Sequence, residues 1–157
     1  MNIDDIFKKL ESLPTYYIEI GVFTGKTKRK KQTIKLGITN AELMFIHEHG
    51  SPLRHIPARP VLKMTIDYAN KNLVGPTISK CVSEYIKSNF DASVVEKLLQ
   101  QLCIRMENYA RDIIYSNDGR LAPNSPNVAR RKKGNHPLFD TGQLARSITC
   151  KLTKETI

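Results

Sequence analysis

The sequence predicts an α+β fold in a single domain, residues 1–157, in which a small antiparallel sheet packs against long α-helices. Apolar residues recur at helical spacing across most of residues 61–115. A run rich in β-branched and aromatic residues, Thr15–Phe23, lies near one end of the chain, and an alternating run, Ser147–Thr153, lies near the other. A chain of 157 residues is also long enough to bury one hydrophobic core without disulfides.

The N-terminal part should form one helix and one hairpin. A short amphipathic helix is predicted within residues 1–13, because apolar side chains recur at helical spacing before Pro14. These side chains are Ile3, Ile6, Phe7, Leu10 and Leu13. Thr15–Phe23 is the predicted first strand, and Lys35–Thr39 is its predicted partner. Residues 24–34 would then be an exposed basic hairpin loop, and the early hairpin would pair with the C-terminal strand.

The middle of the chain is predicted to be helical, with interruptions at its glycines and prolines. Asn40 can cap a helix that ends at Gly50, a residue suited to a helix C-terminus. Ser51–Pro60 holds three prolines, so we expect a stiff, extended connector there instead of a helix. Helical spacing resumes at Val61, and Gly75-Pro76 should break or kink this rod.

The clearest helix follows. Asp91 or Ser93 should cap it, and its apolar stripe continues to about Tyr115. The stripe alternates at three and four residues, through Val95, Leu98, Leu102, Met106, Tyr109 and Ile113. This pattern predicts the main core helix, and packing explains the stripe better than a cofactor site does.

The C-terminal third is predicted to be an exposed loop followed by a short helix and a strand. Residues 116–136 are polar, basic and rich in turn-forming residues, with one helical turn expected near Asn127–Arg131. Asp140 or Thr141 should begin a short turn of helix. Ser147–Thr153 then alternates as the closing strand.

Two basic segments distinguish this chain, whose net charge is +10. The first contains Lys26, Lys28, Arg29, Lys30 and Lys31, and the second contains Arg130, Arg131, Lys132 and Lys133. Basic loops on a nearly neutral body indicate contact with DNA phosphates or with an acidic protein surface. The alternative is that the loops are simply solvated and bind nothing.

Composition argues against a membrane or secreted protein. No apolar stretch comes near the roughly 20 residues that cross a bilayer. The first residues contain acids and lack the apolar centre of a signal peptide. Cys81, Cys103 and Cys150 are far apart in the sequence, so we expect free thiols in a reducing cytoplasm.

No pattern in the sequence indicates catalysis or metal binding. His47-Glu48-His49 is the most suggestive segment, but side chains two apart on a helix point in different directions. Gly25-Lys26-Thr27 lacks the upstream glycine of a phosphate-binding loop. The carboxylates are scattered along helices beside Lys or Arg instead of being clustered for metals. We therefore expect no enzyme activity, no cofactor and no metal.

Five segments occur in an order that resembles the small neck or tail-completion proteins of tailed bacteriophages, which act in head–tail joining and virion morphogenesis. They are a strand (Tyr17 to Phe23), a helix end (Ile46 to Gly50), an Ile-Pro-x-Arg-Pro connector (Ile56 to Leu62), a basic stretch (Arg130 to Gly134) and a Pro-Leu-x-Asp-Thr-Gly-x-Leu segment (Pro137 to Ile148). The resemblance covers roughly residues 15–153. Gly75-Pro76 interrupts what is usually a long helix, and the first basic loop is longer than the pattern requires.

The resemblance implies a structural virion protein at the head–tail junction, made in the cytoplasm of the host bacterium. It implies a homo-oligomeric ring, expected to be a hexamer, which contacts a portal or adaptor protein and a tail tube or tail terminator protein. Duplex DNA would pass through this ring. The implied assembly residues are His47, Glu48, Gly50, Pro57, Arg59, Pro60, Leu138, Asp140, Thr141, Gly142 and Leu144.

These matched residues allow two physical interpretations. Pro57 and Pro60 fix the backbone around Arg59, so the cation could meet a carboxylate of a neighbouring subunit. Gly142 permits close backbone contact, while Leu138 and Leu144 would anchor the turn in the core. Alternatively, all of these contacts are internal: Arg59 would bridge to an acid in its own fold, and Asp140 would only cap its helix. Both interpretations stay open from sequence.

Two other functions remain as alternatives. One is a stand-alone, non-specific DNA-binding protein that uses the two basic loops. The other, weaker, is a metal-dependent hydrolase. Salt-dependent binding of an isolated monomer to duplex DNA would favour the first, and a stoichiometric metal ion would favour the second.

Overall fold

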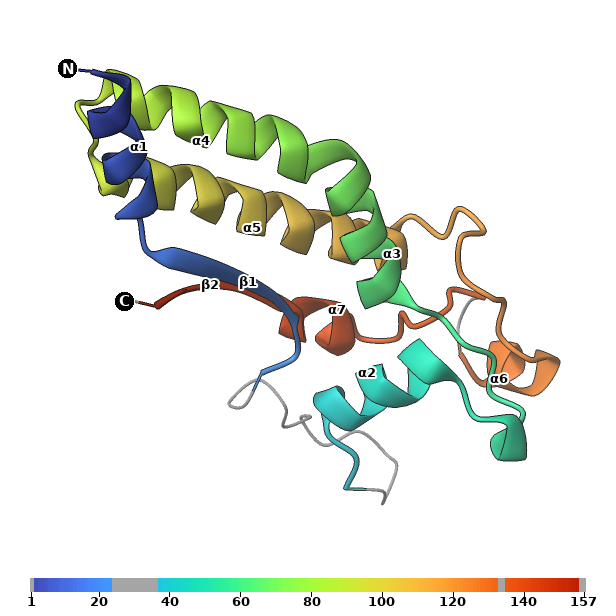
Figure 1. Ribbon diagram of the computed structural model, residues 1–157. Coiled ribbons are helices and arrows are strands. Elements are labelled where there is room, and N and C mark those ends of the chain that lie inside the picture. Colours follow the sequence, from blue (N-terminus) through green and yellow to red (C-terminus); the bar gives the residue numbers. More distant parts are fainter. Residues whose placement is uncertain (1, 24–36, 133–134, 156–157) are drawn as a thin grey trace.

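A computed structural model of the chain describes residues 2–23, 37–132 and 135–155. It shows an antiparallel sheet of β1 (Thr15–Gly21) and β2 (Thr149–Glu155), with Thr15 opposite Glu155 and Gly21 opposite Thr149. Helices stack on one face of this sheet, with α5 directly above it (Figure 1). The predicted α+β class is therefore confirmed.

The prediction of a strand at Lys35–Thr39 is wrong for the residues of it that the structure describes. Residues 37–39 are not in a strand, and residues 35 and 36 lie outside the described ranges. Thr39 caps the next helix instead: its hydroxyl accepts from the Glu42 N–H at 3.2 Å, and the Glu42 carboxylate accepts from the Thr39 N–H at 2.8 Å. This capping box uses the groups that strand pairing would need. The described sheet thus has two strands.

The helices of the upper layer agree closely with the sequence pattern. They are α1 (Ile3–Glu11), α4 (Gly75–Lys87) and α5 (Ala92–Tyr115), and the last two form an antiparallel hairpin (Figure 1). Asp91 caps α5, with its carboxylate accepting from the Ser93 N–H at 2.9 Å. α5 contributes to each of the three hydrophobic clusters formed by the described residues, which confirms it as the main core helix.

The rod before α4 bends, as Gly75-Pro76 predicted. It consists of α3 (Val61–Ala69), a single π-helical stretch η2 (Asn70–Val74) and α4. Pro76 has no N–H to donate to the preceding turn, and a π-helical turn accommodates the missing bond. The change of direction between α3 and α4 is visible in Figure 1.

Short elements form the other end of the molecule. They are α2 (Asn40–His49), η1 (Pro52–Arg54), α6 (Pro126–Arg131) and α7 (Gln143–Ser147). The predicted turn near Asn127–Arg131 is confirmed as α6. The connector is not fully extended, because η1 is one 3₁₀ turn that begins at a proline, a position where proline is tolerated.

Two predicted caps are wrong. Asn40 is the first residue of α2, and Thr39 is its cap. Neither Asp140 nor Thr141 begins α7, because Gly142 is its N-terminal flank, at φ 71°. Among the described helices, none combines the length and apolar character that a membrane span requires.

Candidate functional site

Two of the five segments, the Ile56 to Leu62 connector and the Pro137 to Ile148 segment, meet at the α2–α7 end. Met44 of α2, Val61 of α3, Leu138 and Leu144 belong to one buried cluster, and helices α2 and α7 contact each other. Leu138 and Leu144 are 8% and 3% exposed, which confirms that they anchor the C-terminal segment in the core. The fold therefore joins residues about 90 positions apart into one structural unit, which we call the junction.

Glu48 fixes the angle between α2 and α3. Its carboxylate accepts from the backbone N–H of Leu62 at 3.0 Å and of Lys63 at 2.7 Å. These are orphan donors of the first turn of α3, which has no side-chain cap of its own. A carboxylate at a helix N-terminus is also favoured by the helix dipole. Glu48 is thus a remote helix cap that connects two elements.

Gly50 permits a close backbone crossing. It ends α2 as predicted, with φ 73°. A Cβ at this position would lie 2.8 Å from the Ala58 nitrogen and 2.9 Å from the Ile56 carbonyl oxygen, both backbone atoms. Only glycine suits this combination of positive φ and close contact.

Arg59 is buried, at 5% exposure, and is not displayed to a neighbouring subunit. Its Nε donates to the Ala122 carbonyl and its Nη2 donates to the Pro123 carbonyl, both at 2.7 Å. Its Nη1 lies 3.4 Å from Nδ1 of His47, which is half-buried on α2. The expectation of a displayed cation is therefore wrong, and so is the expectation of an acidic partner.

The Arg59 clasp has a clear electrostatic character. Burial lowers the pKa of the guanidinium from its usual value, because no carboxylate offsets the desolvation of the charge. The planar fork of N–H groups reaches two consecutive carbonyls at once, which an ammonium group cannot do. The clasp ties the connector to the loop after α5. Pro57 is exposed and Pro60 is half-buried beside it.

Gly142 is a second glycine of the junction, and here side chains, not backbone, approach it closely. It has φ 71°, and a Cβ there would lie 2.8 Å from Nη1 of Arg146 and 3.4 Å from the hydroxyl oxygen of Tyr115. Nη2 of Arg146 donates to the Thr141 carbonyl at 2.8 Å. Asp140 is exposed and makes no cap hydrogen bond to α7. Its predicted internal role as a helix cap is thus wrong.

The second basic segment is partly described. Arg130 and Arg131 are exposed on α6, where Nη2 of Arg130 donates to Oδ1 of Asn127 at 3.0 Å. Nζ of Lys132 donates to the Phe139 carbonyl at 3.2 Å, so this lysine is a structural link. The remaining predicted basic contacts lie outside the described residues: Lys26, Lys28, Arg29, Lys30, Lys31 and Lys133.

Sequence analysis missed a second arginine clasp. Arg111 and Glu107 form an ion pair on α5, at the i,i+4 spacing that is common in helices. Arg111 also donates to the Ile148 carbonyl at 3.1 Å, and Glu107 accepts from the Cys150 N–H at 3.4 Å. The pair therefore connects α5 to the start of β2. In the sequence, the position of this ion pair beside the core-facing residues of α5 was the signal that could have indicated these contacts.

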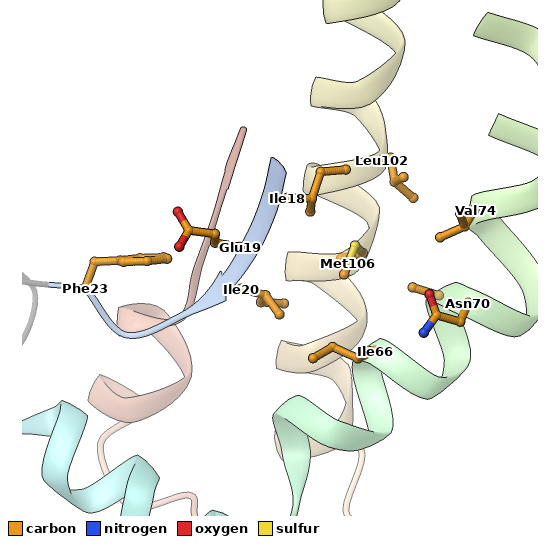
Figure 2. A pocket seen from close by; sticks show the side chains of 10 residues that line it. Ile18, Glu19, Ile20, Phe23, Ile66, Asn70, Val74, Leu102 and Met106 are labelled. Carbon is orange, nitrogen blue, oxygen red and sulfur yellow. The ribbon is translucent and has the colours of Figure 1, made fainter. Parts of the chain in front are cut away.

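An apolar groove lies between β1 and α3, with a volume of about 390 Å³. Its apolar lining includes Ile18, Ile20, Ala69, Val74, Leu102 and Met106. Figure 2 shows Ile18 and Ile20 on the strand side, Ile66, Asn70 and Val74 on the helix side, and α5 between them. Glu19 also borders the groove, but Figure 2 shows its exposed carboxylate on the opposite side of β1 from Ile18 and Ile20. We call this feature the β1–α3 groove.

The reactive side chains of the described ranges are dispersed. Nowhere in residues 2–23, 37–132 and 135–155 do three His, Cys, Asp or Glu side chains gather to hold a metal ion. Cys81, Cys103 and Cys150 are free thiols. A hydrogen bond with Cys103 and burial raise the pKa of Cys150 above its usual value.

Comparison of the chain with protein-family models, with curated proteins and with solved structures finds no significant match.

Proposed function

We propose that this chain is a structural virion protein that forms a ring at the head–tail junction of a tailed bacteriophage. In this role it contacts a portal or adaptor protein and a tail tube or terminator protein, with DNA passing through the ring. The observation that supports the proposal most is the junction itself. The Ile46–Gly50, Ile56–Leu62 and Pro137–Ile148 segments that carry the resemblance pack into one unit, held by the Glu48 cap and the Arg59 clasp.

The chemistry of the junction favours assembly over reaction. Glu48 and Arg59 are charged side chains of the segments that carry the resemblance. Both form hydrogen bonds with backbone groups of their own chain. A charged group held in this way positions the backbone and is not free to exchange protons with a substrate. Such a unit gives a stiff platform, which a ring subunit needs because misaligned contacts do not close.

Particle assembly tests the proposal directly. We expect that deleting the gene from the phage genome gives filled heads and separate tails, and that expression of the chain from a plasmid restores joined, infectious particles. Electron microscopy of the lysates distinguishes the two outcomes. Normal particles from the deletion strain, or mature particles in which mass spectrometry does not find the chain, would refute the proposal.

The DNA-binding alternative has support from the exposed Arg130 and Arg131 of α6. It expects an isolated monomer to bind duplex DNA tightly, with the logarithm of affinity falling steeply as salt rises. Changing both arginines to glutamine should then reduce the salt slope by about two. Virion assembly by the doubly substituted chain would separate the two functions.

A further inference from the structure

Two of the three thiols meet between α5 and β2. Cys103 lies on α5 and is 5% exposed, while Cys150 is half-buried on β2. A hydrogen bond joins these two thiols. The third thiol, Cys81, lies on α4 and belongs to a different hydrophobic cluster, with Tyr85. Cys103 and Cys150 therefore form a pair, to which Cys81 does not belong.

Other contacts hold α5 and β2 together at the level of this pair. Glu107, which lies one turn after Cys103 on the same side of α5, accepts a hydrogen bond from the Cys150 N–H at 3.4 Å. Cys150 lies opposite Ile20 in the sheet, and both pack against the buried cluster that contains Met106. The backbone of β2 thus lies directly against α5 here. A disulfide requires such contact, because its two Cα atoms lie less than about 7 Å apart.

The environment of the pair favours reaction at Cys103. The hydrogen bond from the Cys150 thiol lowers the pKa of Cys103. The thiolate is the nucleophilic form of cysteine, so a lowered pKa raises the reactive fraction. Because Cys103 is buried, a small oxidant such as hydrogen peroxide suits this site better than a bulky one such as oxidised glutathione.

We propose that Cys103 and Cys150 are an oxidation site, which hydrogen peroxide converts to a disulfide between α5 and β2. The Cys103 thiolate attacks one peroxide oxygen, the O–O bond breaks, and the hydroxide that leaves takes up a proton to become water. The Cys150 thiol then loses its proton and attacks the sulfur of the sulfenic acid on Cys103. An S–S bond forms as the S–O bond breaks, and the second hydroxide leaves as water. Overall the two thiols lose two electrons and two protons, and one peroxide becomes two water molecules.

The disulfide would strengthen the junction. It closes the chain between Cys103 and Cys150, and this segment contains Ala122 and Pro123, the acceptors of the Arg59 clasp, together with α7. A covalent link across a loop of this length restricts the unfolded chain, which stabilises the folded one. We expect the oxidised chain to melt about 5–15 °C above the reduced chain.

The oxidation site goes beyond the proposed function and does not depend on it, because its chemistry belongs to one chain. Only its timing rests on the virion role. A virion protein is made in a reducing cytoplasm and leaves it when the host lyses, so the pair would stay reduced during assembly and form the disulfide in the free particle.

Peptide mapping of the oxidised wild type tests the proposal directly. The full chain, freed of reductant, is treated with about one molar equivalent of hydrogen peroxide, and the remaining thiols are blocked before digestion with trypsin. We expect residues 98–105 joined to residues 147–151, an intact mass lower by about 2 Da, and a blocked Cys81. Dithiothreitol should restore three free thiols.

Three alanine variants show which thiols are needed. Cys81→Ala is the matched control, because Cys81 is a helical cysteine with 7% exposure, close to the 5% of Cys103. It should form the same disulfide and show the same rise in melting temperature on oxidation. Cys103→Ala and Cys150→Ala should show no rise. Each variant is compared with its own reduced form, so a loss of basal stability does not obscure the result.

Several results would overturn the proposal. They are three free thiols after peroxide treatment, a link that forms only in urea, a disulfide through Cys81 or between two copies, and an unchanged melting temperature of the oxidised wild type. Mapping uses the wild type alone, so the test holds even where a variant does not fold. The deletion experiment above measures the joining of heads and tails, so each proposal can fail alone.

Discussion

Removal of the Arg59 clasp should destabilise the protein strongly. The Arg59→Ala change abolishes two charge-assisted hydrogen bonds of 2.7 Å, to the carbonyls of Ala122 and Pro123. Hydrogen bonds from charged groups contribute about 1.5–3 kcal/mol each. Relief of the buried charge offsets part of this loss, so we expect the free energy of unfolding to fall by about 3–4 kcal/mol.

Urea denaturation followed by circular dichroism measures this change, and hydrogen exchange locates it. We expect the loop from residue 116 to residue 125 to lose protection before α5 does, because the clasp holds that loop to the connector. Arg59→Lys should recover less than half of the loss, since one ammonium group reaches the two carbonyls less well.

Arg54→Ala is the matched control, because Arg54 is an exposed arginine on the same connector. It should change the free energy of unfolding by no more than about 0.5 kcal/mol. A similarly small effect of Arg59→Ala, with unchanged protection of the loop, would show that the clasp does not hold the junction together.

Three further predictions concern the junction and its surroundings. Gly50→Ala should lower the free energy of unfolding, measured in urea, by more than about 2 kcal/mol, because its Cβ would lie 2.8 Å from a backbone nitrogen at positive φ. Gly75→Ala, with open space around it in a helix, should raise that free energy by about 0.5–1 kcal/mol. Equal effects of the two substitutions would contradict the geometry. Glu48→Ala should cost about 0.5–2 kcal/mol and expose the first turn of α3 to hydrogen exchange, and unchanged exchange there would rule out the cap. Hydrogen bonds from Arg120 lower the pKa of Asp118 from 3.8 to about 2, so its contribution to stability is complete above pH 4 and is lost as the pH falls toward 2. Asp118→Asn should remove this part of the acid dependence of the unfolding free energy, and an unaltered acid profile would count against it.

The sequence was informative where structure depends on local pattern. The apolar stripe from Val95 to Ile113 predicted α5, and its cap at Asp91 was one of two candidates. The strand Thr15–Gly21 followed from β-branched and aromatic residues. In each case the element is specified by its own side chains and by the side of it that faces the core.

Contacts between distant segments were not predictable in the same way. Arg59 binds carbonyls more than 60 positions away, and backbone carbonyls leave no signal in a sequence. Residues 37–39 had the pattern of a strand, but Thr39 caps α2 instead. The capping box needs Glu42 in the first turn of that helix, so it forms only where the helix begins at this position.

The pairing of β1 with β2 has a consequence for synthesis in the cell. Residues 15–21 emerge from the ribosome early, but their partners at residues 149–155 emerge 128 to 140 positions later. The first strand must wait unpaired while the intervening helices form, and loop closure over such a span slows folding. A chain broken off before residue 149 leaves β1 without the partner seen here, so such a fragment would not present the β1 side of the groove in its final form.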